Sequence, residues 1–339
     1  MKYDPRIAQL RFFASFSVAL YHLWTLQLQI QIIPLIFFRA GWLGVPFFFE
    51  LSIFLLLNRL DYNSSFPRYL KRRIKRIWIL YFLAVVTVFL ADRYVFHMGV
   101  TYYDLILHFA FVSFVFAPFS FQYLFWSLQL EEWMYLAIPV IHAVSDKAKF
   151  QTAVLLVFIS FFYSLFIIFL PYDEFHLLYF MPPFWLGAYG WGMIAYLLKK
   201  KQLLKKKQKG EPAKKAKYFI LILYAQYVLI TLVFSSNEFV YEFFTRFLIY
   251  NLALPAFALL IVEPPRVLSR VTVFLGEVSY GVYLWTLLFQ ELFGVTGIVY
   301  GILTAIATEF PLRRREIISR LSYPSIPSVK KVSHLRDNV

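Results

Sequence analysis

The sequence predicts an all-α polytopic membrane protein, and three observations support this fold class. Hydrophobic residues make up 60% of the 339 residues and charged residues only 16%, against about 25% charged residues in an average soluble domain. Apolar runs recur along nearly the whole chain and leave no room for a separate soluble domain. The Lys and Arg residues gather between these runs, where they indicate how the chain is oriented in the membrane.

Reading the apolar runs in order gives about ten transmembrane helices. The first run starts directly after Arg11 and lacks the short apolar core and cleavage site of a signal peptide, so we expect it to be retained. A further run, 104–118, is short and stops at Pro118, and it either crosses the bilayer or dips in and returns. The ten expected spans are 12–33, 43–58, 77–92, 124–144, 151–170, 177–198, 218–235, 244–262, 271–291 and 294–310.

The basic residues decide between these two topologies. If 104–118 crosses the bilayer, the lysine-rich segment 199–217 faces opposite to the arginine-rich segment 59–76, against the tendency of cytoplasmic loops to collect Lys and Arg. If 104–118 re-enters, 31 of the 34 Lys and Arg residues lie on one side of the membrane. The other side then holds only Arg39, Arg93 and Arg246. We therefore expect ten spans, one re-entrant segment, and both termini in the cytoplasm.

The spans form a single membrane domain over 1–310, which we expect to be followed by a basic cytoplasmic tail over 311–339. The basic residues that give the net charge of +15 lie between the apolar runs, as expected for loops at a membrane surface. Membrane lipid is therefore an expected partner and nucleic acid is not. The absence of Cys removes thiol nucleophiles, disulfides and thiolate metal sites. The sequence also lacks a GxSxG elbow, a P-loop, an HExxH motif and a dinucleotide fingerprint, which leaves soluble hydrolase and nucleotide-binding classes without support.

Arg11 and His22 are the first candidate functional residues, because an ionisable group inside the hydrocarbon costs roughly 2.5–3.5 kcal/mol for Arg, Lys or Asp. In a span that runs outward from Arg11, a rise of about 1.5 Å per residue places His22 about 16 Å deeper, near the middle of the bilayer. An imidazole there can shuttle protons. The structural alternative is a histidine that only hydrogen-bonds a neighbouring helix.

A second candidate group lies in the segment FWSLQLEEWMYL at 125–136, at the expected outward end of a span. Glu131 follows Ser127 by four residues and shares its helical face if the helix has begun there. Alternatively, Ser127 is an N-cap, and Glu131 and Glu132 are favoured by the positive end of the helix. Two adjacent carboxylates cannot face one partner, so we expect one to point into the bundle and the other elsewhere.

The third candidate is the pair Arg73 and Arg76 in RYLKRRIKRIWILY, at the cytoplasmic end of the third span. Residues three apart share a helical face, and two guanidinium groups there can bind a phosphate. An ordinary positive-inside flank is the alternative. Glu50 is an uncommon acid within a span, and we expect it to pair with an Arg or the His.

Together and in this order, the motifs resemble those of the acyltransferase-3 family of integral membrane proteins. The segment LRFFASFSVALYHLW is similar to the family's first-helix motif, which carries over to Arg11 and His22. GWLGVPFFFELSIFLLL resembles the second-helix signature, RRIKR the Arg-x-x-Arg pair at Arg73 and Arg76, WSLQLEEWMYL the Trp-Ser-Leu-x-x-Glu-Glu run, and LGEVSYGVYLW the late-helix signature. The chain departs from the family at Ile53, where Gly is usual, and at Thr286, where many members have His.

The resemblance implies an O-acetyltransferase of the bacterial cytoplasmic membrane, with acetyl-CoA as donor and no metal. The implied acceptor is a surface polysaccharide or a lipid-linked glycan, and other envelope polysaccharide-assembly proteins are candidate partners. The donor's phosphates would bind Arg73 and Arg76, while His22 acts as general base or as transient acyl carrier. Arg11 belongs to the same catalytic group, in which Glu131 or Glu132 orients the imidazole or binds the acceptor. The competing functions are a transporter or flippase for a lipid-linked glycan, and a scaffold without catalysis.

Overall fold

The computed structural model describes residues 3–23, 38–60, 66–116, 125–205, 211–234, 237–267 and 269–322, and over these ranges the secondary structure is helical without strands. The first part of the chain forms α1 (Pro5–Leu23), η2 (Ala40–Leu43), α3 (Gly44–Leu60), α4 (Phe66–Arg73), η3 (Ile74–Trp78), α5 (Ile79–Leu90), η4 (Ala91–Val95), α6 (Tyr102–Phe109), α7 (Ser113–Phe116) and α8 (Phe125–Ala143). The second part forms α9 (Asp146–Ile167), α10 (Tyr172–Tyr179), α11 (Pro182–Lys205), α12 (Glu211–Phe234), α13 (Glu238–Glu242), η5 (Phe243–Ile249), α14 (Tyr250–Val262), α15 (Arg270–Glu277), α16 (Ser279–Phe293), η6 (Gly294–Thr296) and α17 (Gly297–Leu321).

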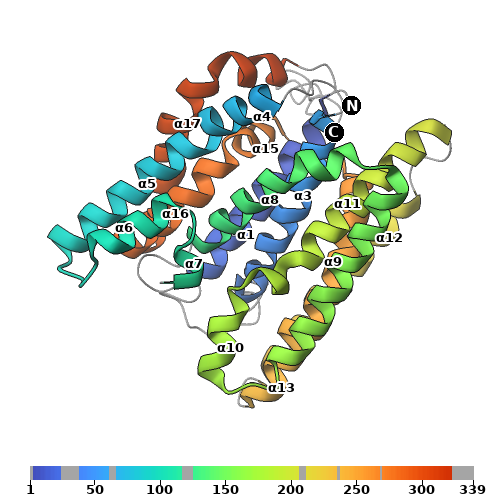
Figure 1. The fold of residues 1–339 in the computed structure, drawn as a ribbon, viewed down its shortest axis with the longest axis horizontal. Coiled ribbons are helices and arrows are strands. Elements are labelled where there is room, and N and C mark those ends of the chain that lie inside the picture. The colour runs from blue at the N-terminus through green and yellow to red at the C-terminus, as the bar shows by residue number, and fades with distance from the viewer. Residues whose placement is uncertain are drawn as a thin grey trace, which may run out of the picture.

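The helices form three groups, a central group with one further group on each side of it (Figure 1). Helices α1, α3 and α8 lie in the middle, and α3 packs on both α1 and α8. On one side are α5, α6, α16 and α17, and on the other are α9, α11, α12 and α14. Because α11 packs on α3 while α15 and α16 pack on α1, the central helices join both groups into one bundle.

A helix is present in the described part of each of the ten predicted spans. By length and composition, four of the described helical stretches are long and apolar enough to cross a membrane: Ala40–Leu60, Asp146–Ile167, Phe239–Val262 and Ser279–Leu321. The count of ten therefore stays a prediction. The last stretch contains Gly294, whose φ of 64° reverses the chain so that α16 and α17 pack against each other. This break lies where the sequence predicted the boundary between two spans.

The segment 104–118 contains α6 and α7, separated by residues 110–112. A helix of eight residues rises about 12 Å, far less than the roughly 30 Å of hydrocarbon. Gln129 of α8 is fully buried and holds this segment in place, since its amide donates to Ser113 Oγ at 2.6 Å and accepts from the Phe114 N–H at 3.1 Å. The segment is thus a pair of short helices packed against the bundle, and Pro118 lies outside the described residues.

The described basic segments gather at one end of the bundle, which we call the basic end. Helix α4, the start of α1 and the last turns of α17 lie there, while α10 and α13 lie at the opposite end (Figure 1). The predicted domain boundary at 310 falls inside α17, which continues to Leu321. Most of the lysine-rich segment and the tail from 323 lie outside the described residues or side chains.

Candidate active site

A narrow inner pocket brings together two of the six predicted site residues, Arg11 and Arg73, and the hydrogen-bond partners of a third, Glu131. It is about 20 Å³ in volume, and its lining includes Arg11 from α1, Ser52 from α3, Arg73 from α4 and Tyr280 from α16. Glu131 of α8 hydrogen-bonds to the Ser52 wall of this pocket. Five helices from both halves of the chain therefore converge on one small space near the basic end.

Glu131 is 1% exposed and accepts hydrogen bonds from Ser52 Oγ and from Tyr135 OH. Tyr135 OH also lies 3.4 Å from Ser52 Oγ. The three groups form a closed triangle in which the carboxylate orients the serine hydroxyl at the pocket wall. These two hydroxyl groups are the described partners of Glu131, and its expected role toward the imidazole of His22 stays a prediction.

Glu132 faces a different partner from Glu131, as the sequence analysis required of adjacent carboxylates. Its Oε2 accepts a hydrogen bond of 2.8 Å from Trp78 Nε1, and the residue is 6% exposed. Ser127 lies inside α8, which begins at Phe125, and its hydroxyl is 2.6 Å from Tyr283 OH. Ser127 is therefore not the N-cap of this helix.

Arg73 lies between the rings of Tyr69 and Tyr135, at 5.7 and 4.8 Å from their centroids, and is 8% exposed. No described carboxylate pairs with it, and its Nε has no hydrogen-bond partner among the described residues. Arg11 is 7% exposed and lies 5.4 Å from the Phe48 ring centroid, also without an ion pair to any described residue. The side chain of Arg76 lies outside the described residues.

A larger pocket of about 600 Å³, the basic pocket, opens beside the inner pocket and shares Leu56, Arg59 and Arg73 with it. Its other cationic lining residues are Lys75, Arg313, Arg314 and Arg315, and its one acidic lining residue is Glu316. A third pocket of about 220 Å³ shares Arg11 and Arg59 with the inner pocket. Arg59 thus lines all three spaces. Sequence reasoning missed it because it lies between two motifs and belongs to neither.

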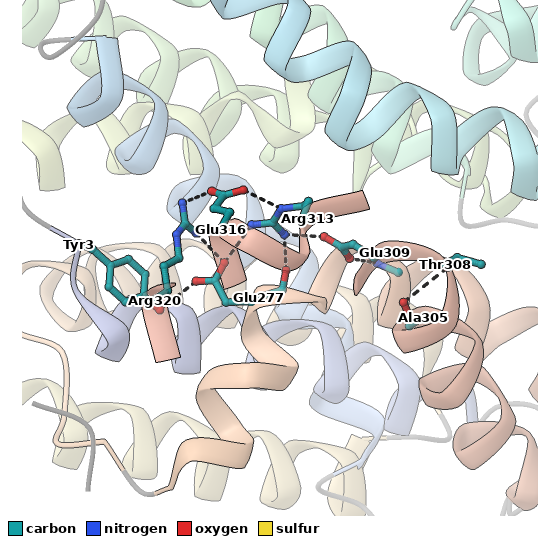
Figure 2. Close-up of polar contacts among 9 residues, drawn as sticks. Tyr3, Glu277, Ala305, Thr308, Glu309, Arg313, Glu316 and Arg320 are labelled. Carbon is teal, nitrogen blue, oxygen red and sulfur yellow. Dashed lines mark hydrogen bonds and ion pairs between the residues drawn. The ribbon is translucent and has the colours of Figure 1, made fainter. Parts of the chain in front are cut away.

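Figure 2 shows the buried ion network that fixes α17 beside the basic pocket. Arg313 pairs with Glu277 at 2.9 Å, with Glu309 at 2.7 Å and with Glu316 at 3.1 Å. Arg320 also pairs with Glu277 and Glu316. Because these pairs occupy the charge of Arg313, the pocket cations without a described carboxylate partner are Arg59, Arg73, Lys75, Arg314 and Arg315.

Two further contacts tie this network to the rest of the bundle. Glu309 Oε2 accepts from the Gly281 N–H at 2.9 Å and so caps the first turn of α16, whose early N–H groups have no partner within the helix. Tyr3 OH donates to Glu277 at 2.9 Å, and burial, reinforced by that carboxylate, raises the pKa of Tyr3. The network therefore joins the chain before α1 to both α15 and α17.

His22 lies at the opposite end of α1 from Arg11, about 16 Å along the helix axis. Its ring packs edge to face against Tyr21, with 5.2 Å between centroids. The structure therefore separates the predicted site residues into Arg11, Arg73 and Glu131 around the inner pocket and His22 near the far end.

The three basic residues predicted on the far side each lie against an aromatic ring. Arg39 is 4.4 Å from the Tyr241 centroid, Arg93 is 4.7 Å from that of Tyr102, and Arg246 is 4.3 Å from that of Trp42. Glu50 is fully buried, and neither carboxyl oxygen has a hydrogen-bond partner among the described residues. The expectation that Glu50 pairs with an Arg or with His22 is therefore wrong.

No cluster of three His, Asp or Glu side chains that could hold a metal ion occurs within the described ranges. Comparison with known proteins gives the family. The family model described as "Acyltransferase domain" matches residues 4–312. A curated relative, "Putative acetyltransferase ORF330" of Acidianus two-tailed virus, is 59% identical over 319 residues, covering 94% of this chain and 93% of that protein. No solved structure gave a significant match. Since the match spans nearly the whole chain, this protein belongs to the acyltransferase-3 family and is a membrane acyltransferase.

Proposed function

We propose that the protein transfers an acetyl group from cytoplasmic acetyl-CoA to a hydroxyl group of a cell-surface or exported polysaccharide. The observation that carries this proposal is the position of Arg73. It is a buried cation without a described carboxylate partner, and it stands where the basic pocket meets the inner pocket. A guanidinium in such a place favours an anionic ligand, and CoA offers phosphates.

The donor end of the reaction is assigned to the basic end of the bundle. The phosphates of CoA bind Arg73, with Arg76 as the expected second cation, and the acyl-bearing arm points into the inner pocket past Arg11. Cations without carboxylate partners outnumber the single acid of the basic pocket, which suits a ligand with several negative charges. We place this end in the cytoplasm because the basic segments gather there.

The acceptor end of the reaction is assigned to His22. Its imidazole either takes the proton from the attacking hydroxyl as general base or carries the acyl group briefly itself. Glu131 and Glu132 serve the donor side in this scheme, because their partners are Ser52, Tyr135 and Trp78. An extended donor arm is needed to cover the distance between the Arg11 level and His22.

The acceptor class and the membrane come from the family resemblance and the relative. The resemblance implies a glycan acceptor and a bacterial cytoplasmic membrane, whereas the 59% identical relative is a viral protein. We therefore infer that the membrane is the cytoplasmic membrane of the cell that makes the protein, and that the acceptor is a glycan exported across it. The family assignment favours this enzyme over a transporter or flippase.

The test compares ester-linked acyl groups on surface glycan by proton NMR, before and after mild alkali. Cells lacking the protein are complemented with wild type, with His22→Ala or with the control His97→Ala, which alters an exposed histidine in a loop, at matched membrane levels. We expect an alkali-labile acetyl signal with wild type and the control only. No change in any acyl signal would contradict surface O-acylation, and a succinyl signal would correct the donor.

A further inference from the structure

The inner pocket contains a buried hydroxyl group that the rest of the site does not explain. Tyr280 of α16 is 2% exposed, lines the inner pocket, and its OH has no hydrogen-bond partner among the described residues. Arg73 Nε, in the same pocket, also has none. Buried polar groups in folded proteins are almost always hydrogen-bonded, and an unmade bond costs about 1–3 kcal/mol. Two such donors on residues that line one small space indicate a ligand that supplies an acceptor.

The size of the two adjoining spaces limits what that ligand can be. The inner pocket has only about 20 Å³, room for one group about the size of a water molecule, such as an amide carbonyl, whereas the basic pocket has about 600 Å³. Arg59 and Arg73 line both spaces and so mark the passage between them. A ligand that fits has a bulky anionic head and a thin, uncharged, polar arm. The arm of an acyl-CoA has this form, and its amide carbonyls are hydrogen-bond acceptors.

We propose that Tyr280 is a positioning residue for the donor, whose hydroxyl hydrogen-bonds an amide carbonyl of the acyl-bearing arm inside the inner pocket, while Arg59, Arg314 and Arg315 bind the phosphorylated head. This inference rests on the proposed function, since it assigns parts of the donor to parts of the site. It adds residues from α3, α16 and α17 that none of the predicted pairs contains.

Two features of the pocket favour an arm over the reacting carbonyl itself at Tyr280. The pocket lies at the level of Arg11, and His22 is about 16 Å farther along α1, so a thioester that reaches His22 has already passed Tyr280. Ser52 presents its hydroxyl at the same wall, held there by Glu131. An arm crossing this space therefore meets neutral hydrogen-bonding groups after it leaves the cations at the entrance.

The experiment measures equilibrium binding of three probes to the purified full-length protein in lipid nanodiscs. The probes are CoA, adenosine 3′,5′-bisphosphate as the isolated head, and pantetheine as the isolated arm, each competing with labelled CoA. Tyr280→Phe should weaken the binding of CoA and of pantetheine about 3- to 10-fold, the effect of losing one neutral hydrogen bond. Its affinity for the bisphosphate should be unchanged. Two further variants change the cations: Arg59→Gln alone, and Arg314→Gln together with Arg315→Gln. Each should weaken the binding of CoA and of the bisphosphate but not that of pantetheine.

Tyr189→Phe is the matched control. Tyr189 is 1% exposed and its hydroxyl also has no partner among the described residues, but it lines none of the three pockets at the site. The Tyr189→Phe variant should bind all three probes with the affinity of wild type. An unchanged affinity of Tyr280→Phe for the bisphosphate also shows that this variant has folded.

The outcomes separate this inference from the proposed function. If Tyr280→Phe binds CoA and pantetheine like wild type, the hydroxyl contacts no donor arm and the inference is wrong. If Tyr280→Phe weakens the binding of the bisphosphate as much as that of pantetheine, Tyr280 acts on the head of the donor or on the fold, and the assignment is also wrong. If wild type binds none of the probes, the CoA donor itself fails and the proposed function falls with it.

Discussion

Replacing Arg313 by Met should strongly destabilise the protein, because this side chain is the cation shared by three carboxylates. Its side chain is 4% exposed, and those of Glu277 and Glu309 are 1% and 0% exposed. Without Arg313, Glu277 keeps Arg320 and Tyr3, but Glu309 keeps only the Gly281 N–H. Breaking a buried pair by removing one partner costs about 3–5 kcal/mol, since the remaining charge is left buried. We expect a loss of that size for Arg313→Met.

Two companion variants make the expected order specific. Glu316 is 42% exposed, so Glu316→Gln removes a partly solvated pair and should cost at most about 1 kcal/mol. Arg313→Lys keeps the charge but cannot reach all three carboxylates, so its cost should be intermediate. The free energy of unfolding is measured in mixed detergent micelles by tryptophan fluorescence. A cost for Arg313→Met within 1 kcal/mol of that for Glu316→Gln would refute this account of the network.

Three further predictions concern the site and the packing. His22→Ala should lower the transfer rate by about 10²–10⁴-fold with membrane insertion intact, and an unchanged rate would exclude proton transfer by this imidazole. Arg73→Ala should mainly raise the KM for the donor, by roughly 10- to 100-fold, because it removes one charge-assisted hydrogen bond. A fall in kcat at saturating donor would instead place Arg73 at the reacting atoms. Gly276→Ala would put a Cβ 1.8 Å from the Ala8 carbonyl oxygen and should lower the free energy of unfolding by about 1–3 kcal/mol. In the control Gly99→Ala the new Cβ has no atom within 4 Å, so the loss should be far smaller. Both values are measured by unfolding in the same micelles.

The positions of the helices could be predicted from the sequence because apolar length and charge spacing are local properties. A helix lies in the described part of every predicted span, and the interruption between the last two lies at Gly294. The short helices α6 and α7 agree with a segment too short to cross. The pair of adjacent carboxylates was also correctly expected to face different partners.

The contacts between helices could not be predicted in the same way. Ser52 meets Glu131 across 79 residues of chain, and Tyr3 meets Glu277 across 274. Neither pair has a periodic signature, because the relative depth and rotation of two helices depend on how their surfaces pack. For the same reason, the sequence did not single out Arg59 or Tyr280, and it gave Glu50 a partner that the described residues do not supply.

The place of α1 in the bundle affects how the protein can be made. This helix leaves the ribosome well before α15 and α16, which pack on it and come much later in the chain. Arg11 must therefore wait until the intervening helices have been made before its inner-pocket neighbour Tyr280 exists. Domains generally mature from the N-terminus during synthesis, but this bundle closes around α1 only when α15 and α16 have been made. A chain truncated before α15 should thus keep only part of the packing around α1, and we expect it to be degraded rather than to work as a smaller enzyme.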